Sequence, residues 1–265
     1  MKVTRHSWGL TSRPVRFQKE KVGARMPAQS TYFVSWRSLL LGTLLLASLV
    51  SCAPAAKSVV PPGKASTPVP RLTYVAIGAS DAFGIGTDDP DRESWPTLLA
   101  GLLGPHVHLI NLGIPGEVVS QARLMELPVA LSAHPDIITV WLAVNDLADG
   151  IPLVDYQQQL RSLLTSLRQG THARIFVGNI PDLTLLPHFF SINPVTLTVE
   201  VNQWNLAIAS ICRETGVTLV DIFSAWADLS NHPEYISRDG FHPSAAGARQ
   251  LAEFFAHAIS AAMAA

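Results

Sequence analysis

From Arg71 onward, short runs rich in apolar and β-branched residues alternate with longer segments of helical periodicity. Runs that are apolar on both faces are typical of strands buried in a parallel sheet. The strand-like runs are 72–78, 107–113, 136–144, 173–180 and 217–223, and the helical segments are 94–103, 118–131, 153–169, 196–215 and 244–263. Five such units predict an α/β fold, with one five-stranded parallel sheet and helices on both of its faces.

The charge of the chain is divided unevenly along its length. Residues 1–70 hold ten Lys or Arg and one acid, whereas residues 71–265 hold nine arginines against nineteen acids, a net charge of −10. An acidic segment without a basic stripe does not suit a phosphate backbone, so we expect no nucleic-acid partner. Residues 71–265 are enough for one domain, which we expect to be monomeric.

The N-terminal part contains an apolar run over residues 39–50. A membrane-spanning helix needs about 20 residues, so this shorter run, preceded by basic residues such as Arg37, is typical of a signal peptide. The run ends in Leu49-Val50-Ser51-Cys52, which resembles the lipobox of bacterial lipoproteins. The resemblance implies cleavage before Cys52 and attachment of lipid to its thiol. The alternatives are an ordinary signal peptide or an uncleaved anchor.

These features divide the chain into three predicted parts. Residues 1–51 are a signal peptide, whose true start could be Met26 because the segment before the apolar run is otherwise long. Residues 52–70 are the lipidated cysteine and a proline-rich tether. Residues 71–265 are the domain, held on a membrane surface outside the cytoplasm by the lipid anchor. The other cysteine, Cys212, lies in an apolar stretch and is interpreted as an inert core residue.

Polar residues follow the ends of the predicted strands. Ser80 follows the first strand, Gly113 and Gly116 follow the second, and Asn145 follows the third. An Asp-x-x-His motif at 239–242 precedes the last helix. Ligands of open parallel sheets lie beyond the carboxyl ends of the strands, so we expect these residues to meet at one rim.

This set of residues suits acyl transfer. A serine hydroxyl such as that of Ser80 needs a base to become a nucleophile, and His242 can accept its proton. Asp239, three residues earlier, can orient the imidazole. The developing oxyanion needs hydrogen-bond donors, which the backbone N–H groups of Ser80 and Gly116 and the side-chain amide of Asn145 can supply. Each residue also has an ordinary interpretation as a turn former or helix cap, and Gly113 competes with Gly116 as a donor.

Taken together, the four blocks resemble the SGNH hydrolases, also called the GDSL esterase/lipase family. That family carries Ser, Gly, Asn and His in this order on a three-layer α/β/α, flavodoxin-like fold, and the resemblance covers about residues 72–250. It implies that Ser80 is the nucleophile, that Asp239 and His242 complete a triad, and that Gly116 and Asn145 are oxyanion donors. It also implies that no metal or cofactor is needed.

The sequence departs from the family pattern in two places. The first block is usually Gly-Asp-Ser-Leu, but here Ala79 precedes the serine and Asp81 follows it. The third block usually has glycine two residues before the asparagine, where this chain has Ala143. Neither change removes a reacting group, so both bear on substrate class and rate more than on the chemistry.

Three further features have weaker functional interpretations. Asp81, Phe189 and Phe190 are candidate substrate-binding residues, the two phenylalanines because the apolar loop 183–195 follows the fourth strand; ordinary covering of the core is the alternative. His106 and His108 share one face of the second strand, but they stand at its start, away from the rim, and we predict no metal site there.

The residues thus predict a lipid-anchored serine ester hydrolase that acts through an acyl-enzyme. Its substrate would be a small or medium acyl ester, a lysophospholipid or an acetylated polysaccharide. An O-acyltransferase or deacetylase of cell-envelope glycans is an alternative, because an acyl-enzyme does not determine which hydroxyl accepts the acyl group. A non-catalytic surface binding module on the same fold is the alternative of another class.

Overall fold

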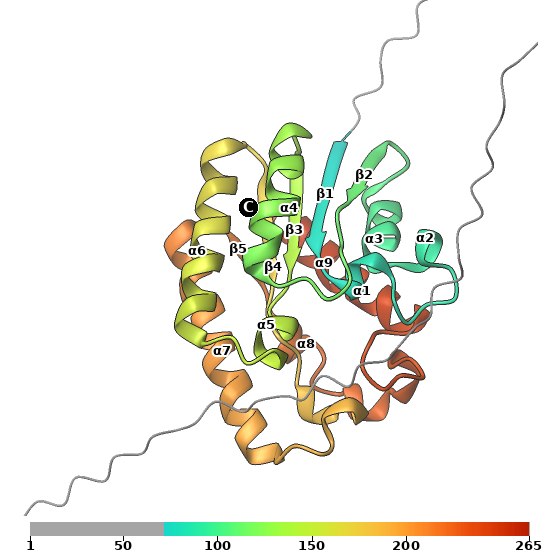
Figure 1. Cartoon of the computed structure of the whole chain (residues 1–265). Helices are drawn as coiled ribbons and strands as arrows, with labels where there is room; N and C mark the ends of the chain where they lie inside the picture. Colours follow the sequence, from blue (N-terminus) through green and yellow to red (C-terminus); the bar gives the residue numbers. More distant parts are fainter. Residues whose placement is uncertain (1–71, 265) are drawn as a thin grey trace, which may run out of the picture. The chain divides into compact units, whose positions relative to one another are not determined.

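The computed structural model describes residues 72–264, which form one sheet with helices on both faces (Figure 1). The strand order is β2-β1-β3-β4-β5, and every neighbouring pair is parallel. The strands are β1 (Leu72–Gly78), β2 (Val107–Asn111), β3 (Ile137–Trp141), β4 (Arg174–Gly178) and β5 (Thr218–Val220). The predicted three-layer, flavodoxin-like fold with a five-stranded parallel sheet is confirmed, because this is the flavodoxin-like order.

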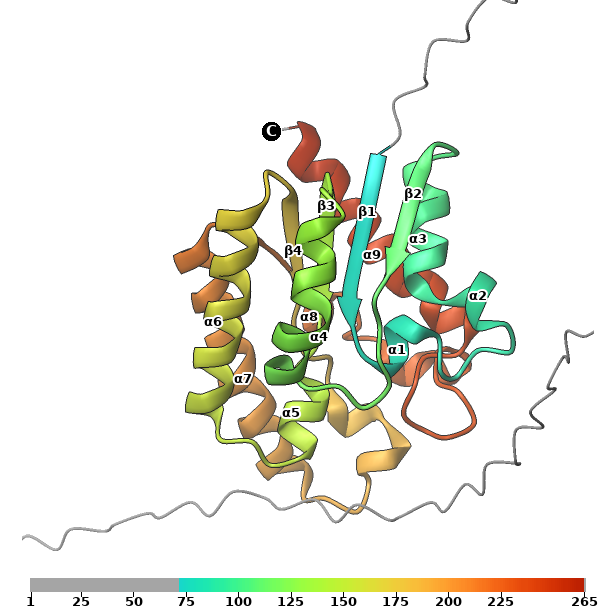
Figure 2. The same cartoon turned by 45° about the horizontal axis from the view of Figure 1, so that its top comes forward.

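The five predicted long helices begin and end within two residues of the observed ones. The α-helices are α1 (Ser80–Phe83), α2 (Pro90–Glu93), α3 (Trp95–Leu103), α4 (Val119–Ser132), α5 (Val144–Ala148), α6 (Leu153–Gly170), α7 (Pro194–Thr215), α8 (Ile222–Ala225) and α9 (Ala245–Ala264). Short 3-10 turns are η1 (Leu183–Leu185), η2 (Pro187–Phe189), η3 (Leu229–Asn231) and η4 (Pro233–Tyr235). Helices α4, α6 and α7 pack together on one face of the sheet, and α3 and α9 pack on the other (Figure 2).

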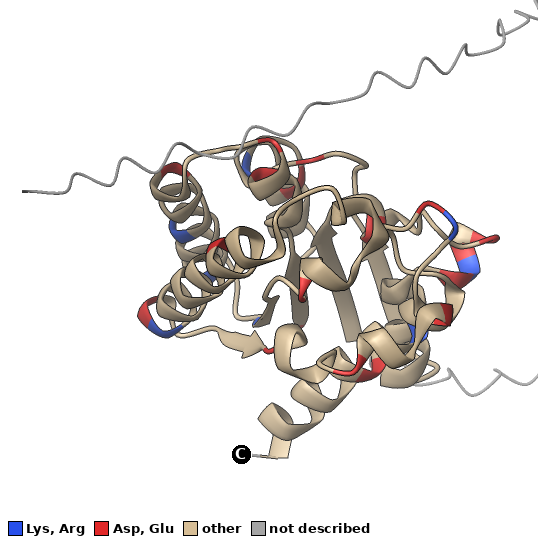
Figure 3. Cartoon of the chain, turned by 90° about the horizontal axis from the view of Figure 1, so that it is seen from below, with Lys and Arg blue, Asp and Glu red and all other residues tan. Residues whose placement is uncertain are grey.

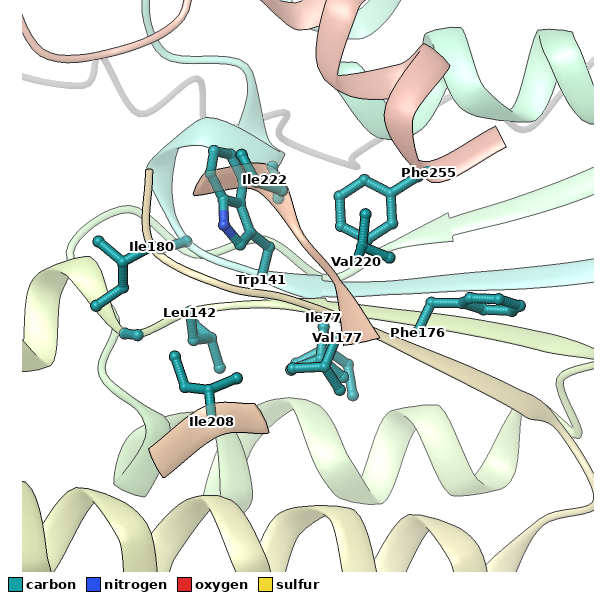
Figure 4. Packing of buried hydrophobic residues seen from close by; sticks show 14 of the residues in the cluster. Ile77, Trp141, Leu142, Phe176, Val177, Ile180, Ile208, Val220, Ile222 and Phe255 are labelled. Atoms are coloured by element: carbon teal, nitrogen blue, oxygen red, sulfur yellow. The ribbon is translucent and has the colours of Figure 1, made fainter. Parts of the chain in front are cut away.

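The core lies between these layers and the sheet. Ile208 of α7 and Phe255 of α9 are fully buried on opposite sides of the strands (Figure 4). On the α9 side, the ring of Trp95 stacks on Phe255 with centroids 4.6 Å apart and meets Trp141 edge-on at 6.2 Å. Burial of this many large apolar side chains stabilises the sheet whose strand ends carry the site.

Helix α4 contains a proline, Pro128, in its interior. The helix runs without interruption through Pro128 to Ser132. Proline removes the hydrogen bond to the carbonyl four residues earlier, and that residue, Leu124, is 76% exposed. Water can therefore replace the lost bond, and the helix tolerates the proline.

The third strand ends earlier than predicted. Strand β3 stops at Trp141 instead of residue 144, because the chain turns at Ala143 and α5 begins at Val144. Ala143 is 1% exposed and has a φ of 96° and a ψ of −41°, in the positive-φ region that favours glycine. The turn brings Asn145, the second residue of α5, directly beyond the end of the strand.

Charged side chains of the described residues are dispersed. Arginines lie singly among acidic residues on the face shown in Figure 3, without a continuous basic stripe. The predicted signal peptide, the lipidation site at Cys52 and the tether lie outside the described residues. Within residues 72–264, no helix has both the length and the apolar character needed to cross a membrane.

Candidate active site

Ser80 lies where β1 ends and α1 begins, and it is 9% exposed. Two glycines allow other loops to close on this turn. A Cβ atom at Gly113 would lie 2.7 Å from the backbone nitrogen of Phe83, and one at Gly86 would lie 2.4 Å from the carbonyl oxygen of Pro243. Both distances are shorter than van der Waals contact, so the absence of a side chain lets these segments approach the serine.

The structure brings Ser80, His242 and Asp239 into one hydrogen-bonded chain. The Oγ atom of Ser80 lies 2.9 Å from Nε2 of His242, and Nδ1 of His242 lies 2.6 Å from Oδ2 of Asp239. Only 16% of the histidine side chain is exposed. Residues 162 positions apart in the sequence thus meet at the carboxyl end of the sheet, as predicted from the strand ends.

Asp239 is held in place by its own loop. Its Oδ1 accepts hydrogen bonds from Ser237 Oγ (2.7 Å) and from the backbone N–H groups of Phe241 (2.9 Å) and His242 (3.0 Å). Partial burial raises the pKa of Asp239, but hydrogen bonds from His242, Ser237 and these N–H groups outweigh it and hold the pKa well below its usual range. The carboxylate is therefore ionised, so Nδ1 of the imidazole carries a proton and Nε2 is free to accept one from Ser80.

Asn145 is brought to the same site by α5. Its side-chain Nδ2 donates to the backbone carbonyl of Glu117 at 2.9 Å, which leaves its second N–H for another acceptor. The next residue, Asp146, braces this arrangement, because both of its carboxylate oxygens accept the backbone N–H of Val119 at 3.1 and 3.2 Å. The loop between β2 and α4 is therefore tied to the start of α5 by two side chains.

The two candidate glycine donors differ in their surroundings. Gly116 is exposed and has a φ of 81°, a conformation that glycine adopts without strain. The N–H of Gly113 donates to Oδ1 of Asn111 at 3.1 Å, so it is already engaged within its own loop. Gly116 is thus the better candidate of the two, although it does not line the pocket that Ser80 and Asn145 share.

An apolar pocket of about 650 Å³, counting the part open to solvent, adjoins Ser80. We call it the Ser80 pocket. Besides Ala79, Ser80, Asp81, Asn145 and His242, it is lined by Trp141, Leu142, Val144, Pro181, Leu183, Leu186, Trp226, Leu229, Tyr235, Ile236, Phe241 and Pro243. Most of these side chains are aliphatic or aromatic, so the pocket can accept an apolar group beside the serine.

The three predicted substrate-binding residues, Asp81, Phe189 and Phe190, have different surroundings in the structure. Asp81 lines the pocket; burial raises its pKa to about 6, although a hydrogen bond from the Ala82 N–H lowers it. Phe189 is 2% exposed and packs on Phe241, and Phe190 is 68% exposed; neither lines the pocket. Substrate binding by these two phenylalanines therefore stays a prediction.

The apolar loop contributes other residues instead. Leu183 and Leu186, which precede the short turn η2, lie in the pocket wall. Trp226 and Leu229 also line the pocket. These two residues come from the segment after β5, which was not predicted to contribute to the site. Its only signal is a cluster of large apolar residues just beyond a strand end.

Two buried acids beside the site were also missed. Glu117 is 3% exposed and Glu126 is 1% exposed. Glu126 lies on the face of α4 that is buried in the core, the same face as Val119, Ala122 and Ala130. An acid within such an apolar stripe is the signal that could have identified it. The histidine pair at 106 and 108 is exposed, and residues 72–264 contain no group of three side chains that could hold a metal ion.

Comparison with known proteins agrees with this geometry. Residues 76–250 match the GDSL-like Lipase/Acylhydrolase family. The chain is 24% identical over 221 residues to an acetylxylan esterase of Xylanibacter ruminicola, which covers 73% of this chain but only 45% of that protein. It is 25% identical over 187 residues to an arylesterase of Vibrio mimicus, which covers 68% of this chain and 84% of that protein.

Solved structures show the same fold. TesA aligns with a TM-score of 0.58 and 22% identity over 71% of this chain and 98% of its own. A lipase/acylhydrolase from Enterococcus faecalis aligns with a TM-score of 0.58 and 17% identity over 72% of this chain and 96% of its own. The resemblance to SGNH hydrolases is thereby confirmed, and the family match spans more than half of the sequence. The chain belongs to the GDSL-like lipase/acylhydrolase family, a family of ester-bond hydrolases.

Proposed function

We propose that this protein hydrolyses carboxylic esters through an acyl-enzyme on Ser80. The observation that carries the proposal is the hydrogen-bonded chain from Ser80 Oγ through His242 to Asp239. Such a chain supplies a nucleophile, a base in the correct tautomer and a fixed counter-charge. The relatives named as esterases support the same reaction class.

The geometry suggests how the reaction proceeds. Ser80 Oγ attacks the ester carbonyl carbon while Nε2 of His242 takes the hydroxyl proton, and the carbonyl oxygen becomes an oxyanion. We propose that the backbone N–H groups of Ser80 and Gly116 and the Asn145 amide stabilise that oxyanion. The carbon–oxygen bond to the alcohol then breaks, and the alcohol leaves with the proton from His242. Water, deprotonated by His242, releases the acid and restores Ser80.

The Ser80 pocket supports an acyl chain as the group bound beside the nucleophile. Its walls are built from side chains such as Leu186, Trp226 and Leu229, and burial of apolar groups there contributes about 0.8 kcal/mol per methylene. We therefore propose that esters of short to medium fatty acids are hydrolysed faster than acetate esters.

Rates on p-nitrophenyl acetate, butyrate and octanoate test this proposal with the purified full-length protein. We expect kcat/KM to rise from acetate to butyrate or beyond, and Ser80→Ala to abolish activity while Ser132→Ala, at the far end of α4, leaves it unchanged. Leu186→Trp, which narrows the pocket, should lower the rate on octanoate more than on acetate. No Ser80-dependent hydrolysis of any ester would support the alternative of a non-catalytic binding module.

Acetylated glycans are a second candidate substrate, favoured by the likeness to an acetylxylan esterase. Release of acetate from acetylated xylan, with a rate on p-nitrophenyl acetate above that on butyrate, would support this candidate over a longer acyl chain. Transfer of the acyl group to an added oligosaccharide, measured by mass spectrometry of that sugar, would support the O-acyltransferase alternative.

We further propose that the protein is a lipoprotein anchored outside the cytoplasm through Cys52. The support is the sequence alone, in which an apolar run of signal-peptide length ends in Leu49-Val50-Ser51-Cys52. When the full chain is expressed in a bacterial host, the protein should be found in the membrane fraction. Mass spectrometry should show that its N-terminal residue is a cysteine carrying the added mass of lipid. The variant Cys52→Ala should lose both properties; a variant that stays bound and cleaved at the same site contradicts the anchor.

A further inference from the structure

Two buried carboxyl groups lie against each other behind the nucleophile. Glu126 projects from α4, and its Oε2 accepts the backbone N–H of Gly78 at 3.0 Å. Glu117 precedes α4, and its carboxyl group hydrogen-bonds to that of Glu126. Oε1 of Glu126 and Oε2 of Glu117 are buried, and apart from the opposite carboxyl group no donor among the described residues reaches them. A hydrogen bond between two acids requires a proton, so one of the two is protonated.

This pair connects the segments that carry the proposed reaction. Gly78, which donates to Glu126, stands two residues before Ser80 on the same turn. The backbone carbonyl of Glu117 accepts the side-chain amide of Asn145 at 2.9 Å, and Gly116 is its neighbour in the chain. A displacement of Glu117 would therefore move Gly116 and Asn145 relative to the nucleophile.

We propose that Glu117 and Glu126, sharing one proton, form a positioning pair that holds the oxyanion donors in register with Ser80. The pair does not touch the reacting atoms. Glu126 is tied to the end of β1, Glu117 is tied to the Asn145 amide, and the shared proton joins the two halves. This inference rests on the proposed function, because it assigns a role in the same reaction.

The electrostatic surroundings favour one shared proton. Burial raises the pKa of Glu126 to about 10; the Gly78 N–H lowers it, whereas the charges of Glu117 and of Asp81 on α1 raise it. Burial also raises the pKa of Glu117. The nearest cation on α4, Arg123, donates instead to Gln159 of α6. Ionisation of both acids would set two like charges against each other in the interior and push the loop away from β1.

A glutamine at position 126 separates positioning from simple packing. In Glu126→Gln the amide oxygen can still accept from Gly78, and the amide N–H replaces the shared proton without titrating. We expect kcat of the wild type on ethyl butyrate, followed in a pH-stat, to fall reversibly by about fourfold between pH 8.5 and 10.5, as a group with a pKa of about 10 loses its proton. We expect kcat of Glu126→Gln to stay within twofold over the same range. The matched control is Glu253→Gln, which replaces an exposed acid on α9 and should keep the wild-type profile.

A second variant removes the hydrogen bonds altogether. Glu126→Leu should lower kcat at pH 7.5 by at least tenfold with KM changed by less than threefold, because the donors are displaced while the acyl pocket is intact. If Glu126→Leu does not fold, the glutamine comparison still decides the matter. Coincident alkaline profiles of wild type and Glu126→Gln would overturn the positioning role, while wild-type hydrolysis would leave the proposed function standing. Failure of the wild type to hydrolyse any ester would overturn both.

Discussion

Glu126→Gln should also change how the stability of the protein depends on pH. The unfolded chain holds Glu126 with an ordinary pKa of about 4.3, whereas burial in the folded protein raises the pKa to about 10. Between these values the folded state keeps a proton that the unfolded state has lost. Each unit of rising pH therefore favours unfolding, by about 1.4 kcal/mol for one proton. From pH 7.0 to 8.5 the free energy of unfolding of the wild type should fall by about 2 kcal/mol because of this proton. The glutamine variant has no such proton, so its free energy of unfolding should not show this fall.

The comparison removes contributions that the two proteins share. Burial raises the pKa of Asp146 to about 7 and that of Cys212 to about 12, and both groups are present in each variant. Urea unfolding followed by circular dichroism at pH 7.0, 7.75 and 8.5 gives the free energy of unfolding of each. The difference between variant and wild type should widen in favour of the variant by about 2 kcal/mol. A difference that stays constant within about 0.5 kcal/mol would refute the assignment of a buried proton to Glu126.

Three further results are expected. Ala143→Gly relieves a positive φ that costs about 1–3 kcal/mol, whereas Ala252→Gly removes an equally buried methyl group from the middle of α9. In urea unfolding, the free energy of unfolding of Ala143→Gly should exceed that of Ala252→Gly by at least about 1 kcal/mol. Equal free energies of unfolding would contradict the backbone strain at Ala143. Asp239→Asn should lower kcat by about 10²–10⁴-fold with little effect on folding, as checked by ester hydrolysis and circular dichroism; full activity would remove Asp239 from the mechanism. His242→Asn should lower kcat/KM by at least about a hundredfold, because it removes the ring nitrogen that accepts the Ser80 proton; undiminished ester hydrolysis would exclude His242 as the base.

The positions of the site residues follow from the sequence because topology determines them. In a parallel sheet all strands end at one edge, so Ser80 and Asn145, which directly follow two apolar strands, were expected to lie at the same edge. The Asp239–His242 loop is separated from β5 by α8, η3 and η4, so its exact position depends on those turns. The hydrogen bonds themselves, such as that between Ser80 and His242, depend on side-chain placement that periodicity does not contain.

Other features could not be predicted, for physical reasons that differ. The pairing of Glu117 with Glu126 depends on how α4 is rotated against β1, and nothing in a helical pattern gives the partner of a buried acid. At Ala143 the sequence shows an alanine where the family pattern usually has glycine, but the positive φ of 96° is a property of the backbone that only the structure gives. The wall formed by Trp226 comes from a segment of short turns, where periodicity is weakest.

Covalent labelling of Ser80 is the most direct test of a serine nucleophile activated by His242. The purified protein would be treated with a fluorophosphonate at pH 7.5, digested, and mapped by mass spectrometry. We predict one adduct, on Ser80, that forms at least a hundredfold more slowly in His242→Ala. An unlabelled Ser80, or labelling that does not depend on His242, would contradict a serine activated by that histidine.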